Sequence, residues 1–217
     1  MYDRKEGQMR VTQIEEISRS RVRVWLEEEF AFVLYKGELR SFHIREGEEI
    51  EQECFDSIMK EILPKRAKLR AMNLLKSREY TVRQLEDKLK AGGYPEKIIE
   101  EALEYVAGYH YTDDLRYAVG FIRSHADSRS HRRIEQDLLR RGIRRDTLEK
   151  AWAVWEEEGG DQDEGKMIQT LLEKKGFDPQ TADRKERQKM YGFLMRKGFS
   201  GDSVRRAVLG SCFDWQE

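Results

Sequence analysis

Apolar and polar residues alternate through much of the first 45 positions, and this period of two predicts β-strands. The alternation is clear over residues 21–26 and 30–35, which are rich in β-branched and aromatic side chains, and a further strand is expected over 11–17. Lys36-Gly37 predicts a turn into another strand over 39–44. Together these segments predict a small antiparallel meander in residues 1–50, with one face that needs a cover.

From Glu51 onward the apolar residues recur every three or four positions, which is the period of an amphipathic helix. Cys54, Ile58 and Ile62 would share one side of this helix. A proline inside a helix removes one hydrogen bond and collides with the preceding turn. We therefore expect a connecting helix over residues 51–65 that ends near Pro64.

The rest of the chain contains one pattern three times, and this repetition is the strongest signal in the sequence. A leucine precedes a glycine by four positions, and an apolar residue follows, at Leu89–Tyr94, Leu138–Ile143 and Leu194–Phe199. Apolar positions also match in the helices expected before and after each of these segments. Each unit is therefore predicted to contain three helices, with the glycine between the second and the third.

The glycine of each unit stands where a helix is expected to end. A residue just beyond a helix C-terminus often adopts the left-handed conformation, which glycine adopts without penalty. Pro95 fits the start of the following helix, and Thr112-Asp113-Asp114 fits the first turn of the next repeat. We predict repeat one at 66–110, repeat two at 111–158, an acidic linker at 159–165 and repeat three at 166–217.

The predicted fold class is therefore mainly α. Three tandem three-helix repeats, each like a helix-turn-helix, form an extended array behind a small antiparallel β meander and a helix. A compact chain of this length would have a radius of gyration of about 17 Å. We expect small-angle scattering of the monomer to give a clearly larger value, and a value at or below the compact one would contradict an extended array.

Composition excludes several classes of protein. Charged residues make up 38% of the chain and the mean hydropathy is −0.84. No apolar run approaches the roughly 18 residues of a membrane span, so we expect a cytoplasmic protein without a membrane segment. The two cysteines, Cys54 and Cys212, are too few and too far apart for a disulfide scaffold or a cysteine-rich zinc site. The net charge of −1 argues against disorder.

Positive charge is concentrated around repeat two. Residues 66–155 contain 19 Lys and Arg against 14 Asp and Glu, a net charge of +5, and most of the excess lies in 123–145. The candidate residues for binding a partner or an anion are Arg132, Arg133, Arg140, Arg141, Arg144, Arg145, Arg196 and Lys197. Such a strip could face an acidic protein surface or DNA phosphates. A solvated arginine-rich helix face is equally compatible with the sequence.

No motif predicts a catalytic, metal or nucleotide site, and we expect no enzyme and no cofactor. Gly160–Lys166 has the glycine spacing of a P-loop, but Met167 replaces the hydroxyl residue that binds magnesium, so an acidic linker is the better interpretation. The four histidines form neither an HExxH motif nor a pair with cysteine. Asp113 and Asp114 are interpreted as residues of a helix start.

The helix-turn-helix shape of the repeats is interpreted as a scaffold. A helix that reads the major groove should be basic or rich in amides, but the third helix of repeat one carries four glutamates and a single lysine. Trp152 and Trp155 occupy positions held by Leu103 and Val106 in repeat one, so we interpret both as core residues.

The order and spacing of these segments resemble the RecX family of bacterial recombination regulators. The residues that carry the resemblance are Tyr111–Ala118, Arg133–Ile143 and Lys189–Phe199, and the similarity covers residues 66–209. One departure lies before the second helix of repeat two, where family members often have a glycine and this chain has Ser128–Ser130.

The resemblance implies three tandem three-helix repeats, preceded in some members by a strand-rich piece. It implies a regulator without catalysis in DNA recombination, repair and the SOS response. Such a protein binds the RecA recombinase and its filament on single-stranded DNA, and mostly inhibits strand exchange, ATP hydrolysis and co-protease activity. The alternative is a helical repeat protein that binds nucleic acid directly, and a weak direct contact with DNA is compatible with both. We expect a monomer.

Overall fold

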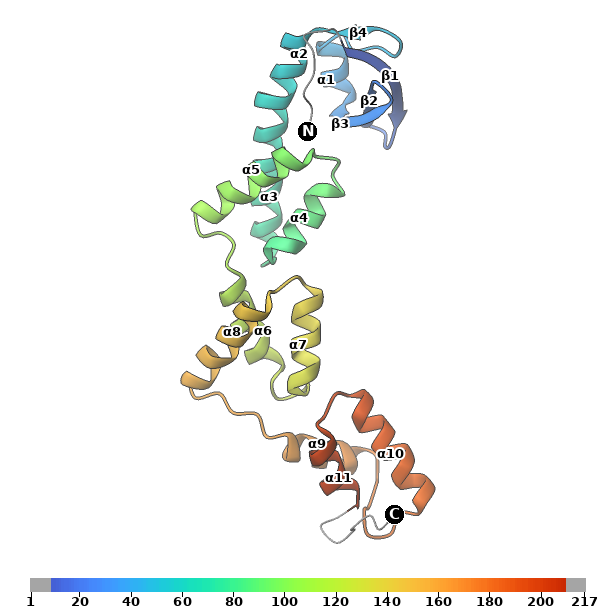
Figure 1. Ribbon diagram of the computed structural model, residues 1–217, viewed down its shortest axis with the longest axis vertical. Helices are drawn as coiled ribbons and strands as arrows, with labels where there is room; N and C mark the ends of the chain where they lie inside the picture. Colours follow the sequence, from blue (N-terminus) through green and yellow to red (C-terminus); the bar gives the residue numbers. More distant parts are fainter. Residues whose placement is uncertain (1–8, 210–217) are drawn as a thin grey trace. The chain divides into compact units, whose positions relative to one another are not determined.

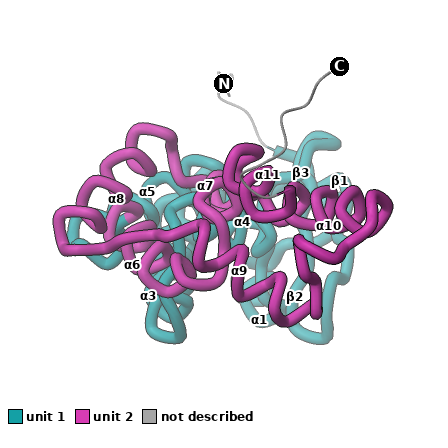
Figure 2. Tube along the Cα trace, turned by 90° about the horizontal axis from the view of Figure 1, so that it is seen from below, with its two compact units in different colours: residues 1–113 teal, residues 114–217 magenta. Residues whose placement is uncertain are grey.

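The computed structural model describes residues 9–209 (Figure 1), so Cys212 and the first eight residues lie outside the described part. The chain divides into two compact units, residues 1–113 and 114–217, which Figure 2 shows in different colours. Within residues 9–209, none of the helices combines the length and the apolar character needed to cross a bilayer.

Unit 1 begins with a four-stranded antiparallel sheet in the order β3-β2-β1-β4. The strands are β1 (Met9–Glu16), β2 (Arg21–Leu26), β3 (Glu29–Tyr35) and the short β4 (Glu49–Ile50). In β2, Val22, Val24 and Leu26 are buried while Arg23 between them is exposed, as the alternation predicts. The three main strands expected from the sequence are confirmed.

The predicted strand over 39–44 is wrong, because the chain forms helix α1 (Lys36–Ser41) directly after β3. The Glu38 carboxylate accepts a hydrogen bond from the Tyr35 N–H at 2.7 Å and also pairs with Arg66. Glu38 therefore caps the start of α1 through the Tyr35 N–H and also fixes α1 to Arg66 of a later helix. The Arg66 contact comes from a helix 28 residues further along the chain, so local sequence does not reveal it.

The prediction that a helix ends near Pro64 is also wrong. Helix α2 (Gln52–Ser57), a π-helical turn η1 (Ile58–Ile62) and α3 (Leu63–Ser77) run on without a break. In the wider turn the Leu63 N–H donates to the carbonyl of Ile58, five residues earlier. This change of hydrogen-bond register leaves one carbonyl without an amide partner, so a residue that lacks an N–H is accommodated there.

The sheet shares one core with repeat one instead of standing apart from it. Buried sheet residues such as Val24 and Phe32 belong to the same cluster as Leu63 and Ala67 of α3. Arg66 donates to the Val33 carbonyl at 3.1 Å. The cover that the apolar face of the meander requires is therefore supplied by the helices that follow it.

All three repeats contain the three helices expected from the sequence. Repeat one consists of α3, α4 (Val82–Lys90) and α5 (Glu96–Gly108). Repeat two consists of α6 (Asp114–His125), α7 (His131–Arg140) and α8 (Arg145–Glu157). Repeat three consists of α9 (Glu164–Lys174), α10 (Arg184–Arg196) and α11 (Gly201–Leu209).

The turn glycines have the left-handed conformation that the pattern predicts. Gly93, Gly142 and Gly198 have φ values of +79°, +88° and +88°. In repeat two, the N–H of Ile143 after the glycine donates to the Leu138 carbonyl at 3.1 Å, which closes the end of α7. Leu138 is fully buried, as are its counterparts in the other two repeats.

Repeats two and three have separate cores within unit 2. The core of repeat two includes Ile134, Leu138, Trp152 and Trp155, so the core positions expected for the two tryptophans are confirmed. The core of repeat three is smaller and includes Leu194 and Phe199 among its buried residues.

Candidate partner-binding surface of unit 2

Three arginines converge on a single carboxylate along α7. The Oδ2 atom of Asp137 lies 2.8 Å from Nη1 of Arg129 and 3.3 Å from Nε of Arg133, and Oδ1 lies 3.5 Å from Nη1 of Arg140. Arg133 and Arg140 lie four residues before and three residues after Asp137, on one face of α7. Arg129 reaches the same carboxylate from the turn before the helix. Asp137 is only 12% exposed, whereas all three arginines reach solvent. The group therefore presents a net charge of about +2.

Aromatic side chains of α6 lie beneath two of the guanidinium groups. Nη1 of Arg141 donates to the Tyr117 hydroxyl at 2.8 Å, and its guanidinium carbon lies 4.8 Å from the Phe121 ring centre. The Arg129 guanidinium lies 5.8 Å from the same ring. Cations over an aromatic face are attracted to it, so these contacts restrict the two side chains before any partner arrives.

Three other candidates of repeat two, Arg132, Arg144 and Arg145, do not contact Asp137. Arg132 is exposed and forms no ion pair within residues 9–209, and the same holds for Arg145. Arg144 lies 3.5 Å from the Asp146 carboxylate at the start of α8. Arg144 and Arg145 follow the end of α7 and are absent from the ion pairs of Asp137. The eight candidates therefore do not form one cluster.

Lys197 of repeat three is brought to the start of α7 by Ser130. The Ser130 hydroxyl donates to the Lys197 carbonyl at 2.9 Å and accepts a hydrogen bond from the Arg133 N–H. Ser130 is buried, and a Cβ added at Gly198 would lie 2.8 Å from its oxygen. Ser130 lies in the segment where the sequence departs from the family pattern, and its hydroxyl both caps α7 and joins the two repeats.

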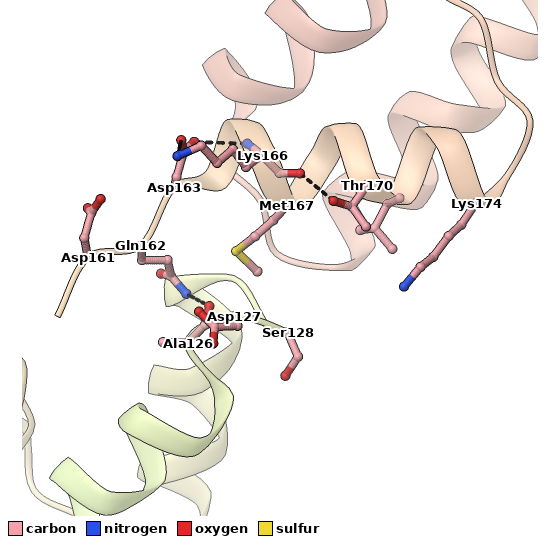
Figure 3. A pocket seen from close by; sticks show the side chains of 11 residues that line it. Ala126, Asp127, Ser128, Asp161, Gln162, Asp163, Lys166, Met167, Thr170 and Lys174 are labelled. Atoms are coloured by element: carbon pink, nitrogen blue, oxygen red, sulfur yellow. Dashed lines mark hydrogen bonds and ion pairs between the residues drawn. The ribbon is translucent and has the colours of Figure 1, made fainter.

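The linker between repeats two and three is also held in place. The Gln162 side-chain amide donates to the carbonyls of Ala126 and Arg129, both at 2.7 Å, and Figure 3 shows Gln162 reaching toward the α6–α7 turn. Through these contacts and Ser130, the two repeats of unit 2 are connected on both sides of the turn at residues 126–130.

A cleft of about 460 Å³ lies beside this linker (Figure 3), but its chemistry is mixed. Asp127, Asp161 and Asp163 line it together with Lys166 and Lys174. Asp163 accepts a hydrogen bond from the Lys166 N–H at 3.0 Å, which lowers the pKa of its carboxyl and starts α9. The Lys166 ammonium lies 3.3 Å from the same carboxylate. A P-loop lysine contacts the nucleotide phosphates, whereas Lys166 forms an ion pair with Asp163.

We define the basic surface of unit 2 as Arg129, Arg132, Arg133 and Arg140. Lys197 contacts α7 through its carbonyl, and its ammonium lies 5.6 Å from the ring centre of Phe193 on α10. Arg129 was not among the candidates drawn from the sequence, and helical spacing does not single it out, because it lies in the turn before α7. Arg196 is exposed at the end of α10. Within residues 9–209, no three His, Cys, Asp or Glu side chains are grouped so that they could hold a metal ion.

The fold defines a protein of tandem three-helix repeats with a sheet built onto the first repeat. Three family descriptions match these repeats in order: RecX first three-helix domain at residues 67–105, second at 113–151 and third at 161–208. Together they cover more than half of the chain, which belongs to the RecX family.

Known relatives support this assignment. The regulatory protein RecX of Caldanaerobacter subterraneus is 32% identical over 190 residues, which are 87% of this chain and 92% of that protein. The regulatory protein RecX of Clostridioides difficile is 27% identical over 213 residues, 95% of this chain and 97% of that protein. The chain therefore belongs to a family of regulatory proteins.

Two crystal structures share the fold. One, of a regulatory protein RecX, aligns with a TM-score of 0.56 and 23% identity over 92% of this chain and 98% of that one. The other, of RecX from Lactobacillus salivarius, aligns with a TM-score of 0.53 and 21% identity over 68% of this chain and 95% of that one. At these identities the likeness concerns the fold alone.

Proposed function

We propose that this chain is a non-catalytic regulator that binds the RecA recombinase and its filament on single-stranded DNA. In this proposal it mostly inhibits strand exchange, ATP hydrolysis and co-protease activity. It acts as a cytoplasmic monomer and needs no cofactor. Tandem repeats suit this task, because each can contact a successive subunit of a filament and the contacts add their effects.

The observation that carries the proposal is the convergence of Arg129, Arg133 and Arg140 on the single carboxylate of Asp137. One carboxylate orients the three guanidinium groups but neutralises only part of their charge. Groups held in place before binding lose less side-chain entropy on contact with a partner. The basic surface of unit 2 is therefore proposed to face acidic groups of the filament, and it also steers the encounter.

The test changes Arg132 and Arg140 to Glu in one variant. Arg132 forms no ion pair with any residue of the described part of the chain, and the Arg140 contact with Asp137 is long. Arg133 is left intact because it orients Asp137. Arg and Glu have similar helix propensities, so α7 should persist. We expect the variant to require at least about tenfold more protein to inhibit the RecA ATPase on single-stranded DNA, a change of about 1.4 kcal/mol.

The matched control is a Lys97→Glu/Lys150→Glu variant, which has the same change of charge on exposed positions outside the basic surface. Circular dichroism checks the fold of both variants, and inhibition is titrated at two salt concentrations, because screening weakens exposed charges. Equal loss in the control and in the Arg variant would contradict a localised site. A parent protein without effect on the ATPase would contradict the proposed function.

A further inference from the structure

Helix α3 in unit 1 carries a second concentration of positive charge. It contains five basic residues and no acidic one: Lys65, Arg66, Lys68, Arg70 and Lys76. Arg66 is occupied by Glu38 and the Val33 carbonyl. The other four form no ion pair within residues 9–209, and three of them are exposed to solvent. These cations are therefore available to a negatively charged ligand.

Three tyrosines form a ladder at the end of α5. The ring centres of Tyr105 and Tyr109 lie 5.0 Å apart, and those of Tyr109 and Tyr111 lie 5.7 Å apart with nearly parallel planes, at 16°. Tyr109 is 59% exposed and Tyr111 is 51% exposed. Large aromatic side chains are seldom left this open in a row, so the ladder offers flat apolar faces to a ligand.

The backbone that carries the ladder is held in an uncommon conformation. His110 has a φ of +55°, a left-handed value that costs energy for a residue other than glycine. The Tyr111 N–H donates to the Val106 carbonyl at 2.9 Å and closes the end of α5. This turn at His110 brings the two exposed rings, which are two residues apart, into their stacked arrangement.

The cations of α3 and the tyrosine ladder meet at Lys68. Its Nζ atom lies 5.4 Å from the ring centre of Tyr105, and Lys65 lies one turn earlier on α3. The helical repeat places Glu96 and Glu100 on the opposite side of α5 from Tyr105, whereas Glu101 shares its side. The region thus combines positive charge with exposed ring faces.

We propose that α3 and the tyrosine ladder form a binding site for single-stranded nucleic acid. Bases stack on Tyr109 and Tyr111, and the phosphates lie along Lys65 and Lys68. Every base has a π-face, so stacking is tolerant of sequence, whereas a duplex keeps those faces covered. An acidic protein would use the cations but would leave the ladder without a role. The site does not rest on the proposed function, which concerns unit 2 and a protein partner.

The first test is binding of a fluorescent oligothymidylate of about 20 nucleotides to the full chain, measured by anisotropy at low salt. A Tyr109→Leu/Tyr111→Leu variant retains apolar bulk but cannot stack, and a Tyr109→Phe/Tyr111→Phe variant retains the rings. We expect the Leu variant to bind at least about tenfold more weakly and the Phe variant within about twofold of the parent, since stacking on one ring contributes about 1–3 kcal/mol.

The second test is the salt dependence of a Lys65→Gln/Lys68→Gln variant. Loss of two phosphate contacts should reduce the slope of log K against log salt by about 1.4. A Lys97→Gln/Lys150→Gln variant, which removes two exposed positive charges away from both surfaces, is the control, and it should retain the parent's oligothymidylate binding and salt slope. The site would be refuted if the parent did not bind the oligonucleotide, if the Leu and Phe variants bound equally well, or if the lysine variant kept the parent slope.

Discussion

Leu138→Ala is expected to lower the free energy of unfolding of repeat two by about 2–5 kcal/mol. Leu138 is fully buried in a core that includes Ile134, Leu148 and Trp152. Removal of its branched end loses the transfer free energy of three carbon atoms and leaves a cavity that the surrounding helices can fill only in part. Thermal and urea unfolding followed by circular dichroism measure this loss.

The adjacent residue provides a matched control. Leu139 is 37% exposed on the same helix, so Leu139→Ala makes the same chemical change outside the core. We expect it to cost less than about 1 kcal/mol, because little apolar area is lost from the interior. The alignment of the three repeats would be wrong if Leu138→Ala unfolded at the same temperature as the parent. It would also be wrong if the Leu138→Ala and Leu139→Ala variants lost the same free energy of unfolding.

Gly93→Ala is expected to destabilise unit 1 by about 2–5 kcal/mol, for two reasons. The φ of +79° costs a residue with a Cβ about 1–2 kcal/mol. The added Cβ would also collide with Cγ2 of Val33, a buried residue of β3, and overpacking of this kind costs about 1–3 kcal/mol. Urea unfolding of the variant and the parent gives the difference.

Two further variants separate these causes. Gly47 has a φ of +85° with open space around it, so Gly47→Ala should show the backbone cost alone. Val33→Ala should make room for the new methyl group, so the double variant with Gly93→Ala should lose less stability than the two single variants together. Equal losses in Gly47→Ala and Gly93→Ala would contradict the contact between the turn and β3.

The elements that could be predicted are those whose causes are local. The leucine-to-glycine spacing around Leu138 and Gly142 reports burial and a left-handed turn, and both follow from neighbouring residues. Helix α1 could not be predicted, because Glu38 is held by Arg66 across 28 positions. The continuation of the helix through Pro64 depends on a π-helical turn that no simple period reveals.

In the candidate surface, too, the features with local causes could be predicted and the long-range contacts could not. The sequence could name Arg132, Arg133 and Arg140 because they are concentrated in one segment. The pairing of Asp137 with Arg133 and Arg140 was readable in principle, since these spacings are those of one helix face. The third contact was not, because Arg129 reaches Asp137 from the turn before α7. The contact of Ser130 with the Lys197 carbonyl joins residues 67 positions apart, so only the folded chain shows that repeats two and three are joined at the start of α7.

The turn glycines also bear on how such a chain can change in evolution. Gly93 and Gly198 have the same role in their repeats, but Gly93 lies against Val33 of the sheet and Gly198 lies against Ser130 of the neighbouring repeat. Each turn has therefore become specific for what it touches. A chimera that exchanged repeat one and repeat three would place each glycine opposite the wrong neighbour. The repeats share the same leucine-to-glycine spacing, but they are not interchangeable. The order of the repeats in the chain is therefore part of what the fold requires.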